Sequence, residues 1–259
     1  MLIAIDIGNS SIAAGVFAKA EEPLCTFAIS AKEPRAADEY LHLLRSSLEE
    51  REIDLKEIKD CAIASVVPML TPAFEQALEK LCGKRPMVLG AGVKTGISIR
   101  TDSPAEVGAD IIANAAAAAK GERGAVLVDF GTATTIFALS EKRELLGGAI
   151  LPGISASMES LRYSTAQLPM VPLGAKKEPL GKNTADCISN GVVLGHAFSV
   201  DGFGRAYQAL LGGDAALIAT GGLAPLILPH CSLPFKEDQN LTLKGLRVIY
   251  EKTRKIKVS

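Results

Sequence analysis

Residues 3–12 read Ile3-Ala4-Ile5-Asp6-Ile7-Gly8-Asn9-Ser10-Ser11-Ile12, and a similar pattern returns at 126–136 as Val126-Leu127-Val128-Asp129-Phe130-Gly131-Thr132-Ala133-Thr134-Thr135-Ile136. Each segment is an apolar run followed by Asp-x-Gly, small hydroxyl residues and a second apolar run. This pattern predicts a strand, a tight turn and a second strand. Because the two copies lie about half a chain apart, they indicate a duplicated fold with two lobes and a central cleft.

The rest of each half alternates between strand and helix patterns, which is typical of the α/β class. The motif Ser103-Pro104-Ala105-Glu106 predicts a helix start, with Ser as N-cap and Glu three residues later, and the helix should run to Lys120. We expect one lobe at 1–120 and the other at 121–259. The stretch 163–182 is irregular and predicts a functional loop. The other predicted helices are 38–50, 72–81, 154–161, 184–207 and 244–252, and the other predicted strands are 61–67, 87–89 and 215–219.

Composition excludes several other classes of protein. Of the 259 residues, 48% are hydrophobic and 22% are charged, which is enough apolar material for one or two domains with a large core. The net charge is −1, Lys and Arg are spread along the chain, and 5% of residues are aromatic with no Trp. The basic stripe and the base-stacking platform of a nucleic-acid-binding protein are therefore not expected.

The cysteine pattern and the hydropathy predict a cytoplasmic protein. The cysteines are odd in number and widely spaced, without a CxxC pair, which predicts reduced thiols rather than disulfides or a zinc site. The first residues lack a basic segment, so no signal peptide is expected. The apolar run 111–119 is interrupted by Asn114 and is too short to span a bilayer. The cysteines are Cys25, Cys61, Cys82, Cys187 and Cys231.

Asp6 and Asp129 are the first candidate functional residues. Either one alone is explained by an Asx-turn that closes a hairpin. The repetition of the whole cassette favours function, because a turn rich in Gly, Ser and Thr exposes N–H groups and hydroxyls that cradle phosphate oxygens. A carboxylate at the strand tip can hold a metal that neutralises those phosphates. Two such turns are what a nucleoside triphosphate requires.

A third glycine turn, Thr220-Gly221-Gly222, directly follows a predicted strand. An ordinary strand-to-helix turn explains it by itself. Paired glycines also let a flat ligand approach the backbone closely. Its place after a strand suits an adenosine pocket.

Asp110 lies early in an otherwise apolar, Ala-rich predicted helix. Stabilisation by the positive helix end is one explanation. The neighbouring Val107, Ile111 and Ile112 indicate burial, which is costly for a carboxylate that nothing uses. A base that accepts a proton from a substrate hydroxyl suits this position equally well.

Other motifs are absent or uninformative. The sequence has no Walker A loop and no complete GxGxxG after a strand, which argues against P-loop and Rossmann machinery. The segment Gly181-Lys182-Asn183-Thr184 predicts a helix N-cap at Asn183 or Thr184. The three histidines, His42, His196 and His230, have no ligand spacing and are assigned no role.

Taken in order, these motifs resemble those of the type III pantothenate kinase family, over about residues 3 to 250. The resemblance implies the duplicated ribonuclease-H-like fold of the acetate/sugar kinase–Hsp70–actin superfamily. The motifs that carry it are Asp6-Ile7-Gly8-Asn9-Ser10, Gly108-Ala109-Asp110, Asp129-Phe130-Gly131-Thr132-Ala133-Thr134-Thr135, Gly181-Lys182-Asn183-Thr184 and Thr220-Gly221-Gly222-Leu223-Ala224, with similar segments at 147–153, 165–169 and 200–202.

The resemblance also implies ligands and residue roles on the donor side. ATP would bind with Mg²⁺, which Asp6 would hold through water, and Asp129 would bind a monovalent cation, K⁺ or NH₄⁺. The residues implied to contact ATP or its phosphates are Asp6, Gly8, Asn9, Ser10, Ser11, Thr132, Gly221 and Gly222.

On the acceptor side, the resemblance implies that Asp110 takes the proton from the pantothenate hydroxyl. Thr184 would reach the acceptor from the neighbouring subunit of a homodimer. The other residues implied to line the acceptor site are Thr101, Gly108, Ala109 and Ile111.

The acceptor side departs from the family pattern. Ile111 stands where the family usually has Arg, and Thr101 and Ser103 stand where it usually has Tyr and Asn. The Arg is expected to pair with the pantothenate carboxylate in a forked contact that Ile cannot form. Arg100 is a candidate replacement for the missing charge.

Three hypotheses follow. The first is ATP-dependent phosphorylation of pantothenate to 4'-phosphopantothenate, the first step of coenzyme A biosynthesis. The second is a kinase of the same fold that acts on a different, uncharged alcohol, which would explain Ile111 and Thr101. The third is a catalytically weak nucleotide-binding regulatory homologue, against which the retained Asp110 argues.

Overall fold

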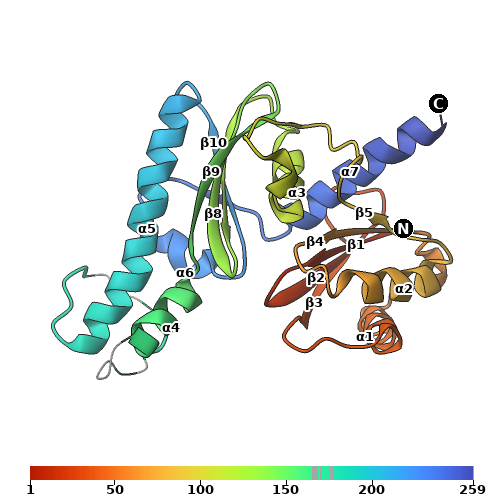
Figure 1. Ribbon diagram of the computed structural model, residues 1–259, viewed down its shortest axis with the longest axis horizontal. Coiled ribbons are helices and arrows are strands. Elements are labelled where there is room, and N and C mark those ends of the chain that lie inside the picture. The colour runs from red at the N-terminus through yellow and green to blue at the C-terminus, as the bar shows by residue number, and fades with distance from the viewer. Residues whose placement is uncertain (165–168, 170, 175–177, 259) are drawn as a thin grey trace. The chain divides into compact units, whose positions relative to one another are not determined.

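The computed structural model describes residues 1–164, 169, 171–174 and 178–258 (Figure 1). The chain forms two compact units. Unit 1 comprises residues 1–97 and 102–120 together with the residues from Asn240 onward, and unit 2 comprises 98–101 and 121–239. The two units differ from the predicted lobes of 1–120 and 121–259 in two places. Residues 98–101 group with unit 2, and the C-terminal helix α7 (Leu241–Val258) groups with unit 1.

Unit 1 is built on a five-stranded sheet in the order β3-β2-β1-β4-β5. Strand β1 pairs antiparallel with β2 and parallel with β4, and β5 continues the parallel side. The strands are β1 (Leu2–Ile7), β2 (Ser11–Phe17), β3 (Cys25–Ser30), β4 (Asp60–Ser65) and β5 (Met87–Val88), and the helices are α1 (Ala37–Glu49), α2 (Thr71–Cys82), α3 (Ala109–Ala118) and α7, with 3₁₀ turns at Leu55–Glu57 and Pro104–Glu106.

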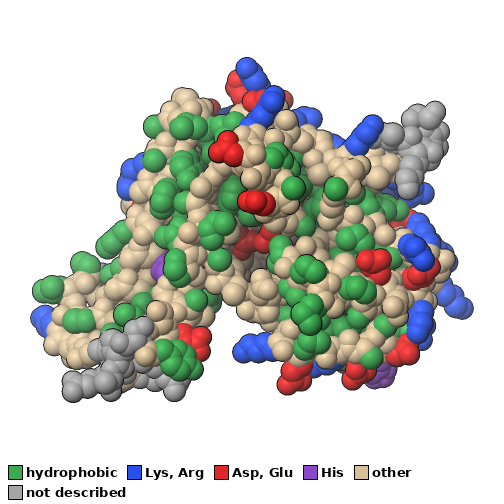
Figure 2. All heavy atoms as spheres, in the orientation of Figure 1, with side chains coloured by type: hydrophobic (Ala, Val, Ile, Leu, Met, Phe, Trp, Pro, Cys, Tyr) green, Lys and Arg blue, Asp and Glu red, His purple; other side chains and the backbone are tan. Residues whose placement is uncertain are grey.

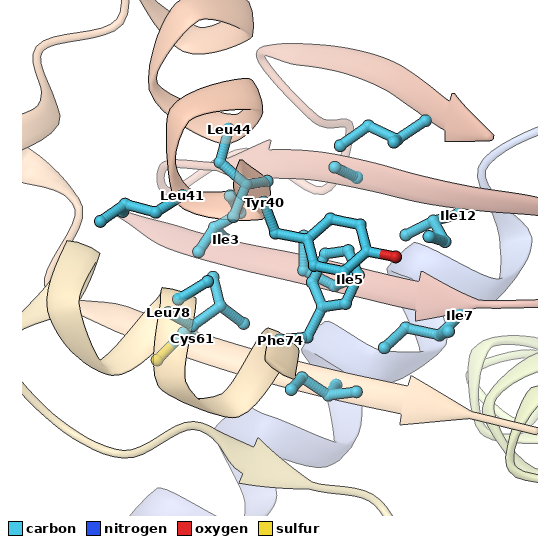
Figure 3. Packing of buried hydrophobic residues seen from close by; sticks show 14 of the residues in the cluster. Ile3, Ile5, Ile7, Ile12, Tyr40, Leu41, Leu44, Cys61, Phe74 and Leu78 are labelled. Carbon is cyan, nitrogen blue, oxygen red and sulfur yellow. The ribbon is translucent and has the colours of Figure 1, made fainter. Parts of the chain in front are cut away.

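The central strand β1 is buried on both faces because its side chains alternate. Ile3, Ile5 and Ile7 pack in the cluster formed with α1 and α2, where the rings of Tyr40 and Phe74 lie 4.2 Å apart (Figure 3). Leu2 and Ala4 face the other side and pack with residues of α3 and α7. A near-continuous apolar run is what a central strand covered on both faces requires.

Helix α7 belongs with unit 1 because it crosses α3 at very short range. A Cβ atom added at Gly245 would lie 1.8 Å from the carbonyl oxygen of Ala113. The hydroxyl of Thr242 donates a hydrogen bond of 2.8 Å to Oδ1 of Asn114, a buried residue of α3. The small residues of α3 permit this close crossing, which an Ala-rich run seen in sequence alone does not reveal.

Unit 2 repeats the same strand order. Its sheet runs β11-β10-β7-β8-β9-β6, so that β7 occupies the central place of β1, and β6 is an added parallel strand beside β9. The prediction of a duplicated α/β, ribonuclease-H-like fold is confirmed. The elements are β6 (Ser98–Ile99), β7 (Ala125–Phe130), β8 (Ala133–Leu139), β9 (Glu144–Pro152), α4 (Ile154–Ser164), α5 (Thr184–Leu210), β10 (Ala216–Thr220), α6 (Ala224–Ile227) and β11 (Lys236–Glu237), with a 3₁₀ turn at Leu228–His230.

The core of unit 2 joins the sheet to the long helix α5. Val126, Val128 and Phe130 of β7 pack against apolar residues of α5, among them Val193 and Ala197. None of the helices in the described part of the chain is both long and apolar enough to cross a membrane.

The predicted start of the helix at Ser103 is wrong. Residues Pro104–Glu106 form a 3₁₀ turn, and the Ser103 side chain makes no capping hydrogen bond. The chain then extends through Val107 and Gly108, and α3 begins at Ala109 with Gly108 as its N-cap. As a result, Asp110 is the second residue of the helix rather than a residue of its second turn.

Asp60 at the start of β4 ties α7 to the sheet of unit 1. Its carboxylate accepts hydrogen bonds from the Tyr250 hydroxyl at 2.6 Å and from Nη1 of Arg254 at 3.2 Å, and it pairs with Lys84. Burial alone raises the pKa of Asp60, but the hydrogen bonds from Lys84 and Tyr250 outweigh it, so the pKa lies below its ordinary value.

We therefore expect Asp60→Asn to lower the free energy of unfolding by about 1–2 kcal/mol at neutral pH, since the two cations are partly exposed. A carboxyl whose pKa is lower in the folded chain stabilises it above the unfolded pKa of about 3.9, and this contribution disappears as the pH falls through the folded pKa. Denaturant unfolding at neutral and acidic pH measures both effects. Asp38→Asn, which removes an exposed ion pair with Lys80, is the control; equal losses in the two variants would contradict the assigned role.

Candidate active site

The turn between β1 and β2 places Asp6 beside exposed backbone and hydroxyl groups. Asp6 is half-buried in β1, between Ala13 of β2 and Ala64 of β4. The N–H of Gly8 donates to the carbonyl of Ser11 at 3.0 Å and closes the turn. Asn9, Ser10 and Ser11 are exposed. The predicted hairpin is present, and its polar groups are accessible to a ligand.

The first turn of α3 carries Asp110. Its Oδ1 accepts a hydrogen bond of 2.8 Å from the backbone N–H of Ile111. Burial raises the pKa of Asp110 above its ordinary value, and the hydrogen bond from Ile111 opposes that shift. A Cβ atom at Gly108 would lie 2.4 Å from Oδ1 of Asp110, so a larger residue there would require the carboxylate to move from its present position. A half-buried carboxylate with a raised pKa is suited to general-base chemistry.

A short series of contacts connects Asp110 with the Asp6 turn inside unit 1. A Cβ atom at Gly108 would lie 3.5 Å from Cγ1 of Val66, and the N–H of Val66 donates to the carbonyl of Ile7 at 3.0 Å. Both Ile7 and Val66 lie at the carboxyl ends of parallel neighbouring strands, β1 and β4. Ligands of open α/β sheets bind at this edge. The structure thus brings the predicted base and one predicted phosphate turn to the same edge of unit 1.

Unit 2 presents Asp129 in the place that Asp6 has in unit 1. Asp129 is the fifth residue of β7, half-buried, between Thr135 of β8 and Thr220 of β10. The turn that follows exposes Gly131 and Thr132. The two central strands share one burial pattern, in which the Asp is the one half-buried residue.

Gly221 lies against Asp129 and explains the third glycine turn. Gly221 has φ +96°, and a Cβ atom there would lie 2.5 Å from Oδ1 of Asp129 and 2.6 Å from the backbone of Phe130. The N–H of Leu223 donates to the carbonyl of Phe130 at 3.3 Å. Gly222 has no atom within 4 Å of such a Cβ position. The structure therefore brings Asp129 and the Gly221 turn together within unit 2.

Sequence reasoning missed two contributors to the Thr132 turn, namely Gly153 and His196. A Cβ atom at Gly153 would lie 2.1 Å from the carbonyl oxygen of Thr132, so the backbone after β9 presses directly on that turn. Buried His196 of α5 contacts the carbonyl of Pro152 through Nε2 at 2.9 Å. The Pro152-Gly153 pair after a long strand could have indicated a turn at Gly153. No sequence pattern indicated a role for His196.

The remaining predicted site residues are more dispersed. Thr101 follows β6 in unit 2, while Asp110 belongs to unit 1. Thr184 is exposed at the start of α5, where Asn183 is the N-cap and accepts from the N–H of Asp186 at 2.9 Å. The motif at 165–169 lies, apart from Pro169, outside the described residues.

Arg100 is engaged within unit 2. Its Nε and Nη2 lie 2.9 and 2.7 Å from Oε1 of Glu144 on the neighbouring strand. The side chain suggested as a replacement for the family arginine is therefore paired with Glu144 in this structure. Ile111 itself is half-buried next to Asp110.

Oxygen atoms make up the donor set near both turns, which suits hard cations such as Mg²⁺ and K⁺ rather than zinc. Among the described residues, no group of three His, Cys, Asp or Glu side chains is arranged to hold a metal. A cation that is bound mainly by phosphate and water needs only one or two protein carboxylates. Asp6 and Asp129 fit this requirement.

A duplicated α/β fold whose two central strands each carry an Asp before a Gly-hydroxyl turn defines the actin-like ATPase fold class. Solved structures agree. Component A of (R)-2-hydroxyglutaryl-CoA dehydratase from Acidaminococcus fermentans matches with a TM-score of 0.57 at 10% identity, covering 100% of this chain and 99% of that one. The ethanolamine utilization protein EutJ from Carboxydothermus hydrogenoformans matches with a TM-score of 0.54 at 15% identity, covering 95% and 89%.

Sequence comparison narrows the class to one family. The type III pantothenate kinase family matches residues 2–206. A type III pantothenate kinase of Moorella thermoacetica is 45% identical, covering 97% of this chain and 99% of its own, and one of Myxococcus xanthus is 41% identical, covering 96% and 98%. The chain belongs to the type III pantothenate kinase family.

Proposed function

We propose that this chain transfers the γ-phosphoryl group of ATP to the hydroxyl of pantothenate, giving 4'-phosphopantothenate, the first step of coenzyme A biosynthesis. Family membership supports the reaction. The observation that carries the mechanism is the half-buried Asp110 carboxylate at the N-terminus of α3, at the same sheet edge as the Asp6 turn. A base and a phosphate turn on one edge are the two elements that phosphoryl transfer to an alcohol needs.

On the donor side, the N–H groups and hydroxyls of Gly8, Asn9, Ser10 and Ser11 bind phosphate oxygens in this proposal. Thr132 contacts ATP from the second turn. Gly222 leaves the adenosine free to approach the backbone, and Gly221 contributes to nucleotide binding by letting the turn lie against Asp129. Mg²⁺ held by Asp6 through water, and a monovalent cation (K⁺ or NH₄⁺) held by Asp129, would neutralise phosphate charge when bound.

On the acceptor side, Asp110 accepts the proton of the attacking hydroxyl. Gly108 and Ala109 form the N-terminal approach to it, and Ile111 of unit 1 and Thr101 of unit 2 also bind the acceptor in this proposal. Ile111 cannot supply the cation that the family pattern leads one to expect at this position, and the Arg100 guanidinium is paired with Glu144. This observation favours a second candidate function, the phosphorylation of an uncharged alcohol such as pantetheine.

Ile111→Arg should distinguish the two acceptors. A guanidinium beside Asp110 would gain a charge-assisted contact with the pantothenate carboxylate, so the KM for pantothenate should fall about tenfold or more. The KM for pantetheine, which lacks the carboxylate, should not fall. A coupled ADP-release assay with both acceptors measures this. Ile111→Met, which adds length without charge, is the control.

Turnover of wild-type protein in the same assay separates the hypotheses. Efficient use of pantothenate supports the first, and use of pantetheine or another alcohol alone supports the second. ATP binding without turnover of any alcohol would overturn the proposed function and leave a regulatory homologue. An unchanged KM for pantothenate in Ile111→Arg would mean that another group already satisfies the carboxylate.

The proposal includes a homodimer and a cytoplasmic location. Unit 2 exposes large apolar side chains on β9, α4 and α5, among them Ile150, Tyr163, Phe198 and Leu210. Figure 2 shows hydrophobic side chains exposed along the part of unit 2 that carries α5. Exposed apolar side chains of this kind fit burial against a second copy. The exposed Thr184 at the start of α5 would then reach the acceptor of the partner subunit. The cytoplasmic location follows from the cysteine pattern.

A further inference from the structure

Buried His196 connects helix α5 with the end of strand β9. Both ring nitrogens lie close to carbonyl oxygens, with Nδ1 2.8 Å from that of Val192 one helical turn earlier and Nε2 2.9 Å from that of Pro152. The contact with Val192 stays within the helix. The contact with Pro152 joins two elements 44 residues apart in sequence. A buried polar side chain that joins separate elements fixes their positions.

Pro152, the residue that His196 contacts, lies next to the Thr132 turn. Pro152 is the last residue of β9 and pairs with Ala133 of β8, directly after Thr132. Gly153 follows, and it lies so close to the Thr132 turn that a Cβ atom would be 2.1 Å from the carbonyl oxygen of Thr132 and 3.0 Å from that of Gly131. A small shift of Pro152 therefore moves the backbone that supports Gly131 and Thr132.

We propose that His196 is a positioning residue for nucleotide binding, acting through Pro152 and Gly153 on the Thr132 turn. The inference rests on the proposed function in one respect, namely that Thr132 contacts ATP. In the tautomer that carries its hydrogen on Nε2, the ring donates to the Pro152 carbonyl and fixes the end of β9, and the close Gly153–Thr132 contact transmits that position to the turn. A ligand site held by a second layer of hydrogen bonds loses affinity when that layer is loosened.

Two near-isosteric variants separate the two contacts of the ring. Gln at position 196 places an amide N–H₂ where Nε2 lies and keeps the donor to Pro152, whereas Asn places it where Nδ1 lies and keeps only the contact inside the helix. We expect His196→Asn to raise the dissociation constant for Mg²⁺ with a non-hydrolysable ATP analogue about tenfold. His196→Gln should bind within about twofold of wild type. Isothermal titration calorimetry on the full chain measures both.

A matched control comes from the same helix. Asp201 is also buried on α5, and its carboxylate accepts from the N–H groups of Ser232 and Leu233 at 2.7 and 3.0 Å; these two residues follow the 3₁₀ turn at Leu228–His230. Asp201→Asn should lower the melting temperature without changing analogue affinity, which separates loosening of α5 from movement of the turn.

The KM values provide a second readout. In His196→Asn, the KM for ATP should rise while the KM for pantothenate stays unchanged. Equal analogue affinity in the Asn and Gln variants, or an equal rise of both KM values, would overturn the role of His196. Failure of wild-type protein to bind the analogue would instead overturn the proposed function, so the two failures are distinguishable.

Discussion

Replacing Asp110 with Asn should lower kcat by about 10²- to 10⁴-fold while the dissociation constant for the ATP analogue stays within about twofold of wild type. Asn cannot accept the proton of the attacking hydroxyl, but its Oδ1 can still accept the hydrogen bond from the N–H of Ile111 that fixes the side chain at the start of α3. The turn at Asp6 is untouched. Single-turnover kinetics and calorimetry measure the two quantities separately.

The same variant should not be less stable than wild type at neutral pH. Burial raises the pKa of Asp110, so the ionised carboxylate opposes folding increasingly as the pH rises above the unfolded pKa, and the full penalty is present above the folded pKa. Asn removes the buried charge and with it this penalty. The stability difference should vanish as the pH falls below the unfolded pKa of about 3.9, where both chains are uncharged at this position. Gain of stability with loss of function is typical of catalytic groups.

The control for Asp110→Asn is Glu106→Gln. Glu106 is exposed in the 3₁₀ turn just before α3 and carries the same charge. Its replacement should leave kcat nearly unchanged, which excludes a general effect of charge near the helix. Full turnover in Asp110→Asn would mean that another group accepts the proton. Loss of analogue binding in that variant would instead assign Asp110 a role in the nucleotide site.

The duplicated fold was predictable because its signal is local. In both halves, a run of apolar residues forms a strand buried on two faces, and Asp-x-Gly ends it. The same continuous apolar pattern and the same turn chemistry act twice. Asp6 and Asp129 accordingly occupy the same strand position. The parallel pairing of β1 with β4 had no local signal in the sequence, because it depends on contacts between distant residues. This pairing brings Val66, and with it Gly108, to the edge of the sheet that carries Asp6.

The errors have the same physical origin. The capping pattern at Ser103 predicted a helix start, but the extended Val107 and Gly108 override it, because Gly108 must pack beside Val66 and leave room for the Asp110 carboxylate. Helix α7 was expected in the second lobe, because the close packing of Gly245 against Ala113 joins residues that are distant in sequence and leaves no local pattern. His196 was assigned no role because its partner, Pro152, is 44 residues away.

Among changes near the turn that follows β7, Gly221→Ala should have the largest effect on stability and on nucleotide affinity. The alanine would have to adopt φ near +96°, and its Cβ would overlap Oδ1 of Asp129 and the backbone of Phe130. Strain and overpacking together should lower the free energy of unfolding by about 2–4 kcal/mol. Because the backbone of β7 cannot give way easily, the Asp129 carboxylate must move. We therefore expect the affinity for the ATP analogue to fall more than tenfold.

Gly222→Ala tests whether the loss of affinity is caused by distortion of the protein or by a direct clash with the nucleotide. The added Cβ meets no atom within 4 Å, so the melting temperature should not change, and any rise in the KM for ATP would report direct approach of the nucleotide to this residue. If Asp129 binds the monovalent cation, Gly221→Ala should also shift the KCl concentration needed for half-maximal activity, whereas Gly222→Ala should not. Wild-type affinity in Gly221→Ala would show that the contact between the Gly221 turn and Asp129 is unimportant for nucleotide binding, since that contact cannot survive the added methyl group unchanged.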